Sequence, residues 1–251
     1  VSPNIFSRDY LEVYLQRSSW LFTNSGSTAL PDLAFAQNNF MQNQMIDAGD
    51  HSSPALFDLD GDGDLDLVAG RYVDPVFGTA TLVQYENVGN ATVPDFNWVS
   101  DDYLSFSESD FINLKPQFAD FNFDGKTDLV FTATSLSTSV TKIYVLYNKV
   151  SPGVDFQGQS PAELPVSILF SENIHAKDIN RDGLMDLLIG KSAGTIEYWR
   201  NNGTKAVPSF VQEDSDYLNL GPSIERQNPS LTTADLDSDG RVVVVDYKTG
   251  R

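Results

Sequence analysis

Four short segments of the chain place carboxylate and amide side chains at alternate positions. They read DLDGDGDLD at 58–66, DFNFDGKTD at 120–128, DINRDGLMD at 178–186 and DLDSDGRVV at 235–243. A hard cation such as Ca²⁺ takes about 6 to 8 oxygen ligands, so a short loop must turn several side chains toward one point. Positions 1, 3 and 5 can do this around a tight turn, which the glycine at position 6 permits. The spacing therefore predicts calcium-binding loops.

The four loops offer similar sets of oxygen ligands. Side chains at positions 1, 3, 5 and 9 would bind directly, and position 7 can offer its main-chain carbonyl. The predicted ligand positions are Asp58, Asp60, Asp62, Asp64 and Asp66 in the first loop, Asp120, Asn122, Asp124, Lys126 and Asp128 in the second, Asp178, Asn180, Asp182, Leu184 and Asp186 in the third, and Asp235, Asp237, Asp239 and Arg241 in the fourth. Because position 9 of the fourth loop is Val243, that site should bind Ca²⁺ more weakly than the other three, unless Asp246 or water substitutes.

Simple turns, an EF-hand and a magnesium site each account less well for the loops. Aspartate, asparagine and glycine make good turns without any ion. Repetition in register favours ion binding, since the five aspartates of 58–66 would repel one another strongly without a cation. An EF-hand needs glutamate at position 12 and flanking helices, whereas position 12 here is Ala69, Phe131, Ile189 or Asp246. Mg²⁺ fits less well because it demands tighter octahedral geometry.

Two further patterns recur with the loops. An aliphatic or β-branched run follows each of them directly, such as LVA at 67–69, which predicts a strand. Between the loops, Asn24, Asn87 and Asn201 are each followed by glycine two residues later and by proline seven residues later. The copy after Asn148 is irregular and predicts a longer loop.

The repeat, about sixty residues long, predicts the fold. We interpret one repeat as four short antiparallel strands with the acidic loop between the first two. Such units favour an all-β β-propeller, in which small sheets stack radially, over a sandwich, which would not demand the same loop in every unit. The predicted division is the second half of a blade at 1–50, full blades at 51–110, 111–170 and 171–228, and the first half of a blade at 229–251.

With these loops and the signature at 24–31, 87–94 and 201–208, the chain resembles the FG-GAP or VCBS repeat family. Its calcium-loop blades are known from integrin α-subunit heads and many secreted bacterial proteins. The resemblance implies structural Ca²⁺ at the loop aspartates and asparagines, and an extracellular or cell-surface location. It also implies a propeller of usually seven blades, of which this chain supplies about four. Missing blades or other domains of a parent protein would complete it; the alternative is that 229–251 joins 1–50 in a four-bladed ring.

Composition excludes several partners. With 35 acidic and 16 basic residues the formal net charge is −19, so nucleic acid is excluded as a partner and an anionic membrane surface would repel the chain. No apolar run approaches the roughly 18 residues of a membrane span, so no membrane insertion is expected. The absence of cysteine excludes a disulfide scaffold and thiolate metal sites.

Catalytic signals are weak. GKSAG at 190–194 matches a hydrolase nucleophile pattern but would connect two strands, where that pattern needs a strand, a sharp turn and a helix. The two histidines, His51 and His175, precede their acidic loops by different numbers of residues, so they indicate neither a catalytic triad nor a zinc cluster. The conspicuous carboxylates are assigned to metal, where their pKa values should be depressed rather than raised for acid catalysis.

We therefore expect no enzymatic activity. The predicted function is a calcium-stabilised, non-catalytic protein-interaction or adhesion module of a secreted or cell-surface protein. The alternative is a glycan-binding propeller or an accessory module of a carbohydrate-active enzyme, in which Trp20, Trp98 and Trp199 could stack on sugars. The sequence does not identify the partner.

Overall fold

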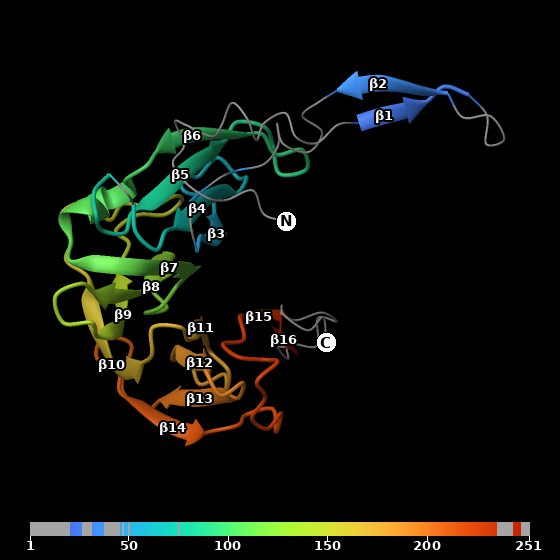
Figure 1. Ribbon diagram of the computed structural model, residues 1–251. Coiled ribbons are helices and arrows are strands. Elements are labelled where there is room, and N and C mark those ends of the chain that lie inside the picture. Colours follow the sequence, from blue (N-terminus) through green and yellow to red (C-terminus); the bar gives the residue numbers. More distant parts are fainter. Residues whose placement is uncertain are drawn as a thin grey trace. The chain divides into compact units, whose positions relative to one another are not determined.

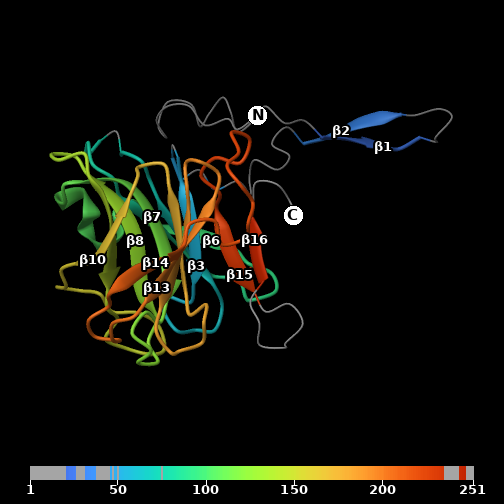
Figure 2. The ribbon, with the colours of Figure 1, turned by 90° about the horizontal axis from the view of Figure 1, so that it is seen from below.

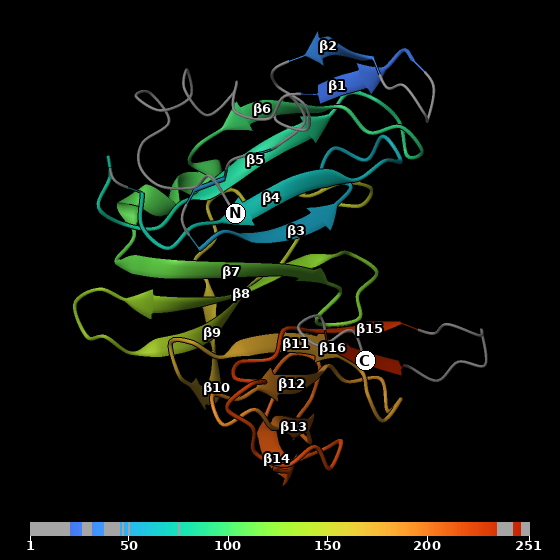
Figure 3. The ribbon, with the colours of Figure 1, turned by 45° about the vertical axis from the view of Figure 1, so that its right-hand side comes forward.

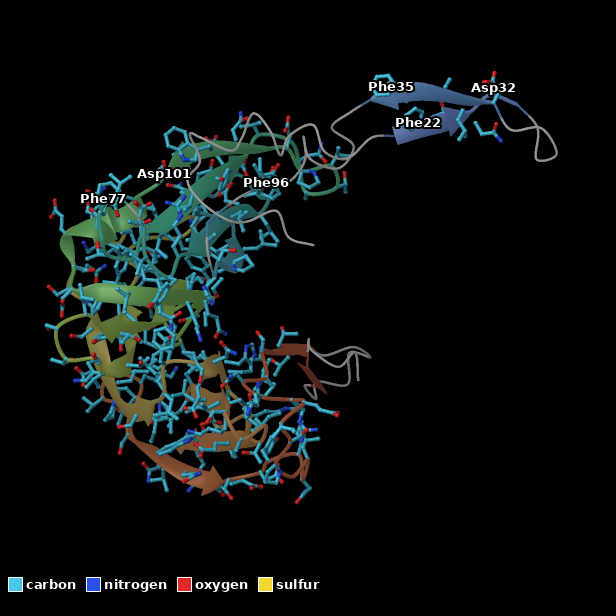
Figure 4. The ribbon with its side chains drawn as sticks, in the orientation of Figure 1. Phe22, Asp32, Phe35, Phe77, Phe96 and Asp101 are labelled. Atoms are coloured by element: carbon cyan, nitrogen blue, oxygen red, sulfur yellow. The ribbon has the colours of Figure 1, made fainter. Side chains whose placement is uncertain are left out.

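The computed structural model describes residues 21–26, 32–37, 46, 48–49, 51–74, 76–234 and 243–246. The chain divides into two compact units, Val1–Asp50 and His51–Arg251. The first unit contains an antiparallel pair, β1 (Leu21–Asn24) and β2 (Leu33–Gln37). Phe22 and Phe35 lie on these two strands with their ring centroids 5.8 Å apart in an edge-on arrangement (Figure 4).

The described part of the second unit consists of antiparallel sheets (Figure 1). The first sheet has β3 (Ser53–Phe57), β4 (Asp66–Gly70), β5 (Leu82–Asn87) and β6 (Phe96–Ser100). The second has β7 (Phe111–Ala119), β8 (Asp128–Ser135), β9 (Thr141–Leu146) and β10 (Ala162–Ile168). The third has β11 (Asn173–Lys177), β12 (Asp186–Gly190), β13 (Ile196–Asn201) and β14 (Phe210–Asp214), and β15 (Leu231–Ala234) pairs with β16 (Val243–Asp246) (Figure 2). This architecture confirms the predicted all-β fold of four-stranded antiparallel blades.

Helix is nearly absent from the described residues, where η1 (Tyr103–Glu108) is a short 3₁₀ segment. None of the helical structure described is long and apolar enough to cross a membrane.

Within the second unit, successive sheets meet along their first strands. β3 lies beside β7, β7 beside β11, and β11 beside β15 (Figure 3). Each four-stranded sheet then continues away from its first strand in chain order. Repetition of one sheet-to-sheet contact is the arrangement expected of propeller blades.

The second strand of each four-stranded sheet lies in the core. Leu129 and Phe131 on β8 are fully buried in the cluster shared with the first sheet, whereas Val130, between them, is buried in the cluster shared with the third sheet. Because successive side chains of a strand point to opposite faces, a strand covered on both faces needs an unbroken apolar run. This requirement explains the aliphatic residues that follow each acidic loop.

Two strand-ending glycines allow neighbouring sheets to approach closely. A Cβ atom on Gly70, at the end of β4, would overlap the carbonyl oxygen of Leu114 on β7 and lie 2.8 Å from Cδ of Pro116. A Cβ atom on Gly190, at the end of β12, would overlap the carbonyl oxygen of Pro229. The main chain of the next sheet therefore occupies the space that a side chain would need.

Polar side chains also join the first strands of the second and third sheets. Lys115 Nζ on β7 donates to the Glu172 carbonyl at 2.9 Å and to Asn173 Oδ1 at 3.0 Å. Burial lowers the pKa of Lys115 to about 8, although the charge of Glu172 acts in the opposite direction. Gln117 exchanges two hydrogen bonds with the main chain of Ala176, at 3.0 and 3.1 Å. These bonds fix the register between the two sheets.

His175 on β11 contacts the first strands on both sides. Its Nδ1 lies 3.3 Å from Gln117 Nε2 on β7, and its Nε2 lies 2.8 Å from Thr233 Oγ1 on β15. Since the Gln117 amide nitrogen can only donate, Nδ1 accepts and the neutral ring carries its proton on Nε2. Burial, together with the positive charge of Lys177, lowers the pKa of His175 to about 4.

We predict that His175 makes the fold acid-sensitive. The folded pKa of about 4 is below the ordinary value of 6.5, so the unfolded chain binds more protons between these values. The contribution is therefore fully present above pH 6.5 and is lost as the pH falls toward 4, by at most about 3 kcal/mol. The measurement is urea denaturation between pH 4 and 7 for the wild type and for His175→Gln, which cannot titrate. The difference between the two proteins should shrink in acid; a constant difference contradicts the prediction.

Candidate metal centre

Each acidic loop that the structure describes connects the first and second strands of one sheet. Residues 58–65 join β3 to β4, residues 120–127 join β7 to β8, and residues 178–185 join β11 to β12. The fourth loop, with the predicted ligands Asp235, Asp237, Asp239 and Arg241, lies outside the described residues. The loops thus occupy equivalent corners of the three sheets.

A shared ladder of hydrogen bonds folds the loops. The carboxylate at position 1 accepts from the main-chain N–H of the position 6 glycine, at 3.1 Å in the first loop, 2.9 Å in the second and 3.0 Å in the third. The side-chain oxygen at position 3 accepts from the main-chain N–H of position 5, and the side-chain oxygen at position 5 accepts from the main-chain N–H of position 7. In the third loop both of these distances are 2.9 Å. Each polar side chain thereby caps a turn of its own loop, as aspartate and asparagine commonly do.

Position 4 has a role that the sequence did not reveal. It is left-handed in all three loops, with φ of 85° at Gly61, 55° at Phe123 and 64° at Arg181. The position 6 glycines are left-handed too, with φ between 82° and 101°. Two left-handed residues two positions apart reverse the chain sharply, and in the first loop the carboxylates of Asp58 and Asp66 at its two ends lie close together.

The aspartate at position 9 is a buried structural group as well as a predicted ligand. One oxygen of Asp128 accepts from the N–H of Phe121 at 3.0 Å and the other from the N–H of Asn148 at 2.8 Å. Asp66 and Asp186 repeat both bonds in their own sheets, at distances of 2.8 to 3.1 Å. Position 9 therefore ties the acidic loop to the end of the third strand.

The asparagine at that strand end belongs to the second sequence signature. Asn87 Oδ1 accepts from the N–H groups of Gly89 at 3.1 Å and Asp95 at 2.9 Å, which closes the turn between β5 and β6. Asn24 and Asn201 make equivalent bonds in their own hairpins. The two motifs found separately in the sequence are thus one connected network in each full sheet.

The first loop brings its carboxylates closest together. Oxygens of Asp58, Asp60 and Asp66 all lie within 4.8 Å of one another. Asp64, which is 8% exposed, has a buried Oδ1 without a hydrogen-bond partner among the described residues. A buried carboxylate oxygen is costly to leave unpaired. The oxygen-only donor set and this orphaned atom fit a hard cation such as Ca²⁺.

The second and third loops have asparagine at position 3. Asn122 Nδ2 donates to Asp124 Oδ2 at 3.3 Å, and Asn180 Nδ2 donates to Asp182 Oδ2 at 2.9 Å. The amide relieves part of the charge repulsion that the first loop carries, while its oxygen remains a possible ligand.

Burial governs the pKa values of the carboxyls at position 9 and of Asp64. Burial raises the pKa of Asp128 to about 6, and it also raises the pKa values of Asp66 and Asp186. Burial and then the charges of Asp62 and Asp66 raise the pKa of Asp64. The pKa of Asp124 is lowered instead: burial raises it, but hydrogen bonds with Lys126 and Asn122 and the charge of Lys126 outweigh burial. A cation beside the buried carboxyls would supply positive charge that offsets their desolvation.

A cavity of about 290 Å³ adjoins the first loop. Its wall includes Leu59, Asp60 and Asp66 from the first loop and β4, Tyr103 from η1, and Val154 from the second sheet. Burial, with the charges of Asp155 and Asp66, raises the pKa of Tyr103 to about 12, so its hydroxyl stays protonated at neutral pH. Val154, on the connection between β9 and β10, therefore borders the candidate site of the first sheet.

The segment that resembled a hydrolase motif has another structure. Residues 191–194 form the turn between β12 and β13, where the Gly194 N–H donates to the Lys191 carbonyl at 2.9 Å. Lys191 pairs with the fully buried Glu172 at 2.9 Å.

The three tryptophans that could stack on sugars have different surroundings. Trp199 packs against the core cluster shared by the second and third sheets, and its ring N–H donates to Glu197 at 2.8 Å. Trp98 is 48% exposed, and Trp20 lies outside the described residues.

Comparison with known proteins identifies a solved structure and a sequence family that are similar to parts of this chain. The chain is similar to a solved structure of an Agrocybe aegerita lectin, described as recognising non-reducing terminal N-acetylglucosamine, with 16% identity and a TM-score of 0.38. The alignment covers 86% of this chain and 66% of the lectin. No curated protein sequence is significantly similar. The other similarity is to the FG-GAP-like repeat family, whose profile matches residues 178–245, from the third acidic loop into β16.

Proposed function

We propose that the chain is a non-catalytic protein-interaction module whose sheets are stabilised by Ca²⁺, within a secreted or cell-surface protein. The observation that carries the calcium part is the first loop, where three carboxylates converge and where Asp64 of the same loop has a buried oxygen without a hydrogen-bond partner among the described residues. The common hydrogen-bond ladder of the second and third loops extends the proposal to them. Weak calcium sites fill where the ion is plentiful, which favours an extracellular location.

The residues that would hold the ions are those predicted from the loops. The side chains involved are Asp58, Asp60, Asp62 and Asp66 in the first site, Asp120, Asn122, Asp124 and Asp128 in the second, and Asp178, Asn180, Asp182 and Asp186 in the third. When bound, Ca²⁺ supplies positive charge that offsets both desolvation and mutual repulsion. The aspartate at position 9 then links the bound ion to the end of the third strand, because its carboxylate accepts the main-chain N–H of the asparagine there.

Exposed apolar side chains support an interaction role. The middle three residues of both β6 and β14 are exposed, and they include Trp98 at 48%, Val99 at 43% and Val211 at 47%. Tryptophan is enriched at protein interfaces because it combines a large apolar area with a polar N–H. These fourth strands are the surface that we assign to a protein partner.

Calcium binding is tested by isothermal titration with metal analysis of the dialysed protein. Asp124→Ala should bind one ion fewer than the wild type, since Asp124 is exposed and serves only the second loop. Each site filled at a hundredfold excess over Kd should add about 2.7 kcal/mol to the free energy of unfolding. Glu108→Gln, which removes one exposed charge outside the loops, should leave the stoichiometry unchanged. Absence of calcium binding by the wild type overturns this part of the proposal.

The partner class needs a separate test. We expect Trp98→Ala and Val99→Ser to weaken capture of a protein ligand from extracellular material while leaving calcium binding intact. A glycan array probed with the wild type in calcium discriminates the alternative. Saturable binding to defined glycans, lost in Trp98→Ala, would replace the protein partner by a carbohydrate.

A further inference from the structure

The connection between β9 and β10 of the second sheet lies against the first acidic loop. This is the irregular copy of the second signature, and it follows Asn148. Val154 donates its main-chain N–H to the carbonyl of Leu59, position 2 of the first loop, at 3.0 Å. Val154 also forms part of the wall of the 290 Å³ cavity beside Asp60 and Asp66.

Glycines on both sides allow this contact. Gly153 has φ of 73°, and a Cβ atom on it would lie 2.8 Å from the Leu59 oxygen and 3.1 Å from the carbonyl carbon of Asp60. Gly61, at position 4 of the loop, would place a Cβ atom 2.9 Å from Cβ of Pro152. Main chain therefore packs on main chain next to a predicted ligand, with no space for an additional carbon.

The same connection is tied to the second loop. Asn148 donates its main-chain N–H to Asp128 at 2.8 Å, and its side-chain Nδ2 donates to the Gly153 carbonyl at 3.0 Å and to the Val150 carbonyl at 2.9 Å. A continuous path thus runs from Asp128 through Asn148 and Gly153 to Asp60. Asn148 Oδ1 accepts from the N–H groups of Val150 at 3.2 Å and Asp155 at 2.8 Å, as the side-chain oxygens of Asn87 and Asn201 do in their own turns.

The second loop has a looser contact with the third sheet. Lys205, from the turn between β13 and β14, lies 5.1 Å above the Phe123 ring, and its Nζ is 3.5 Å from the Phe123 carbonyl. An exposed lysine on a flexible stem constrains a loop far less than main-chain packing does.

We infer that residues 148–154 couple the first and second calcium sites, so that filling either one raises the affinity of the other. The inference rests on the proposed calcium binding. Gly153 and Asn148 act as positioning residues, because they hold the main chain of the first loop in the arrangement that directs Asp60 toward the ion. Coupling between two sites is reciprocal, and couplings of this kind typically change affinity by about fivefold or more.

The test compares two left-handed glycines of the same connection. Gly153→Ala would collide with the first loop, whereas Gly158, with φ of 68°, has no described atom within 4 Å of an added Cβ atom. Both substitutions carry the cost of the left-handed backbone, so Gly158→Ala is the matched control. Calcium titrations are made on proteins whose third site is removed by Asp182→Ala. We expect Gly153→Ala, and not Gly158→Ala, to weaken the first site about fivefold or more.

A double-mutant cycle measures the coupling itself. Asp124→Ala, which removes the second site, should weaken the first site about fivefold when Gly153 is present and by much less in Gly153→Ala. Hydrogen exchange at the Val154 amide should speed up when EDTA replaces calcium. If calcium binds but Asp124→Ala leaves the first site unchanged, the coupling is wrong and the proposed function stands. If no loop binds calcium, the proposed function itself fails.

Discussion

Asp128→Ala should destabilise the protein by about 3 kcal/mol or more even in EDTA. Asp128 is fully buried, and its two oxygens accept the main-chain N–H groups of Phe121 and Asn148. Alanine leaves both donors buried without partners, and each unsatisfied group costs about 1 to 3 kcal/mol. The measurement is urea denaturation of the ion-free protein.

Asp124→Ala provides the contrast for this prediction. Asp124 is exposed, and its structural partners are the neighbouring Lys126 and Asn122. In EDTA its loss should change the free energy of unfolding by less than about 1 kcal/mol, whereas in calcium it should remove the stabilisation of one site. Equal effects of the two substitutions in EDTA would show that position 9 has no separate structural role.

Gly70→Ala should destabilise the protein by about 3 kcal/mol or more, with or without calcium. The added methyl group would overlap the Leu114 carbonyl, which belongs to the main chain of β7 and cannot rotate away as a side chain could. The first and second sheets would have to separate, and buried side chains such as Leu82 and Phe131 would lose contacts at this boundary. Thermal and urea denaturation measure the effect.

Gly158→Ala again serves as the control for Gly70→Ala. It adds the same methyl group in open space, where its cost is the left-handed backbone term of about 1 to 2 kcal/mol, a term that Gly70 does not carry because its φ is not left-handed. A loss at Gly70 no larger than this would mean that the two sheets can move apart freely. The corresponding substitution Gly190→Ala tests the boundary formed with Pro229 in the same way.

Local sequence patterns were sufficient to predict the strands and loops. The run after each acidic loop, such as Leu129 to Phe131, is apolar because the second strand is buried on both faces. The spacing of the loop aspartates depends on contacts within nine residues, which repeat whenever the loop repeats. Fold class therefore followed from periodicity alone.

Contacts between distant residues could not be predicted in this way. Position 9 contacts the third-strand asparagine in each full sheet, but the pairs Asp66 with Asn87 and Asp186 with Asn201 have different separations because the intervening hairpins differ in length. Gly70 looked like any strand-ending glycine, since its neighbour Leu114 lies in the next repeat. Phe123 gave no sign of its left-handed backbone, which the loop as a whole imposes.

The ordered contact of first strands has an evolutionary consequence. Strand pairing stays within each sheet, and neighbouring sheets of the second unit meet along their first strands. Tandem duplication of a gene segment encoding one sheet and its loop would therefore deliver a new copy whose edges already match those of its parents. An array of such sheets can therefore lengthen without a new kind of interface. The sequence of the fourth strands can then diverge while the contacts between sheets are kept.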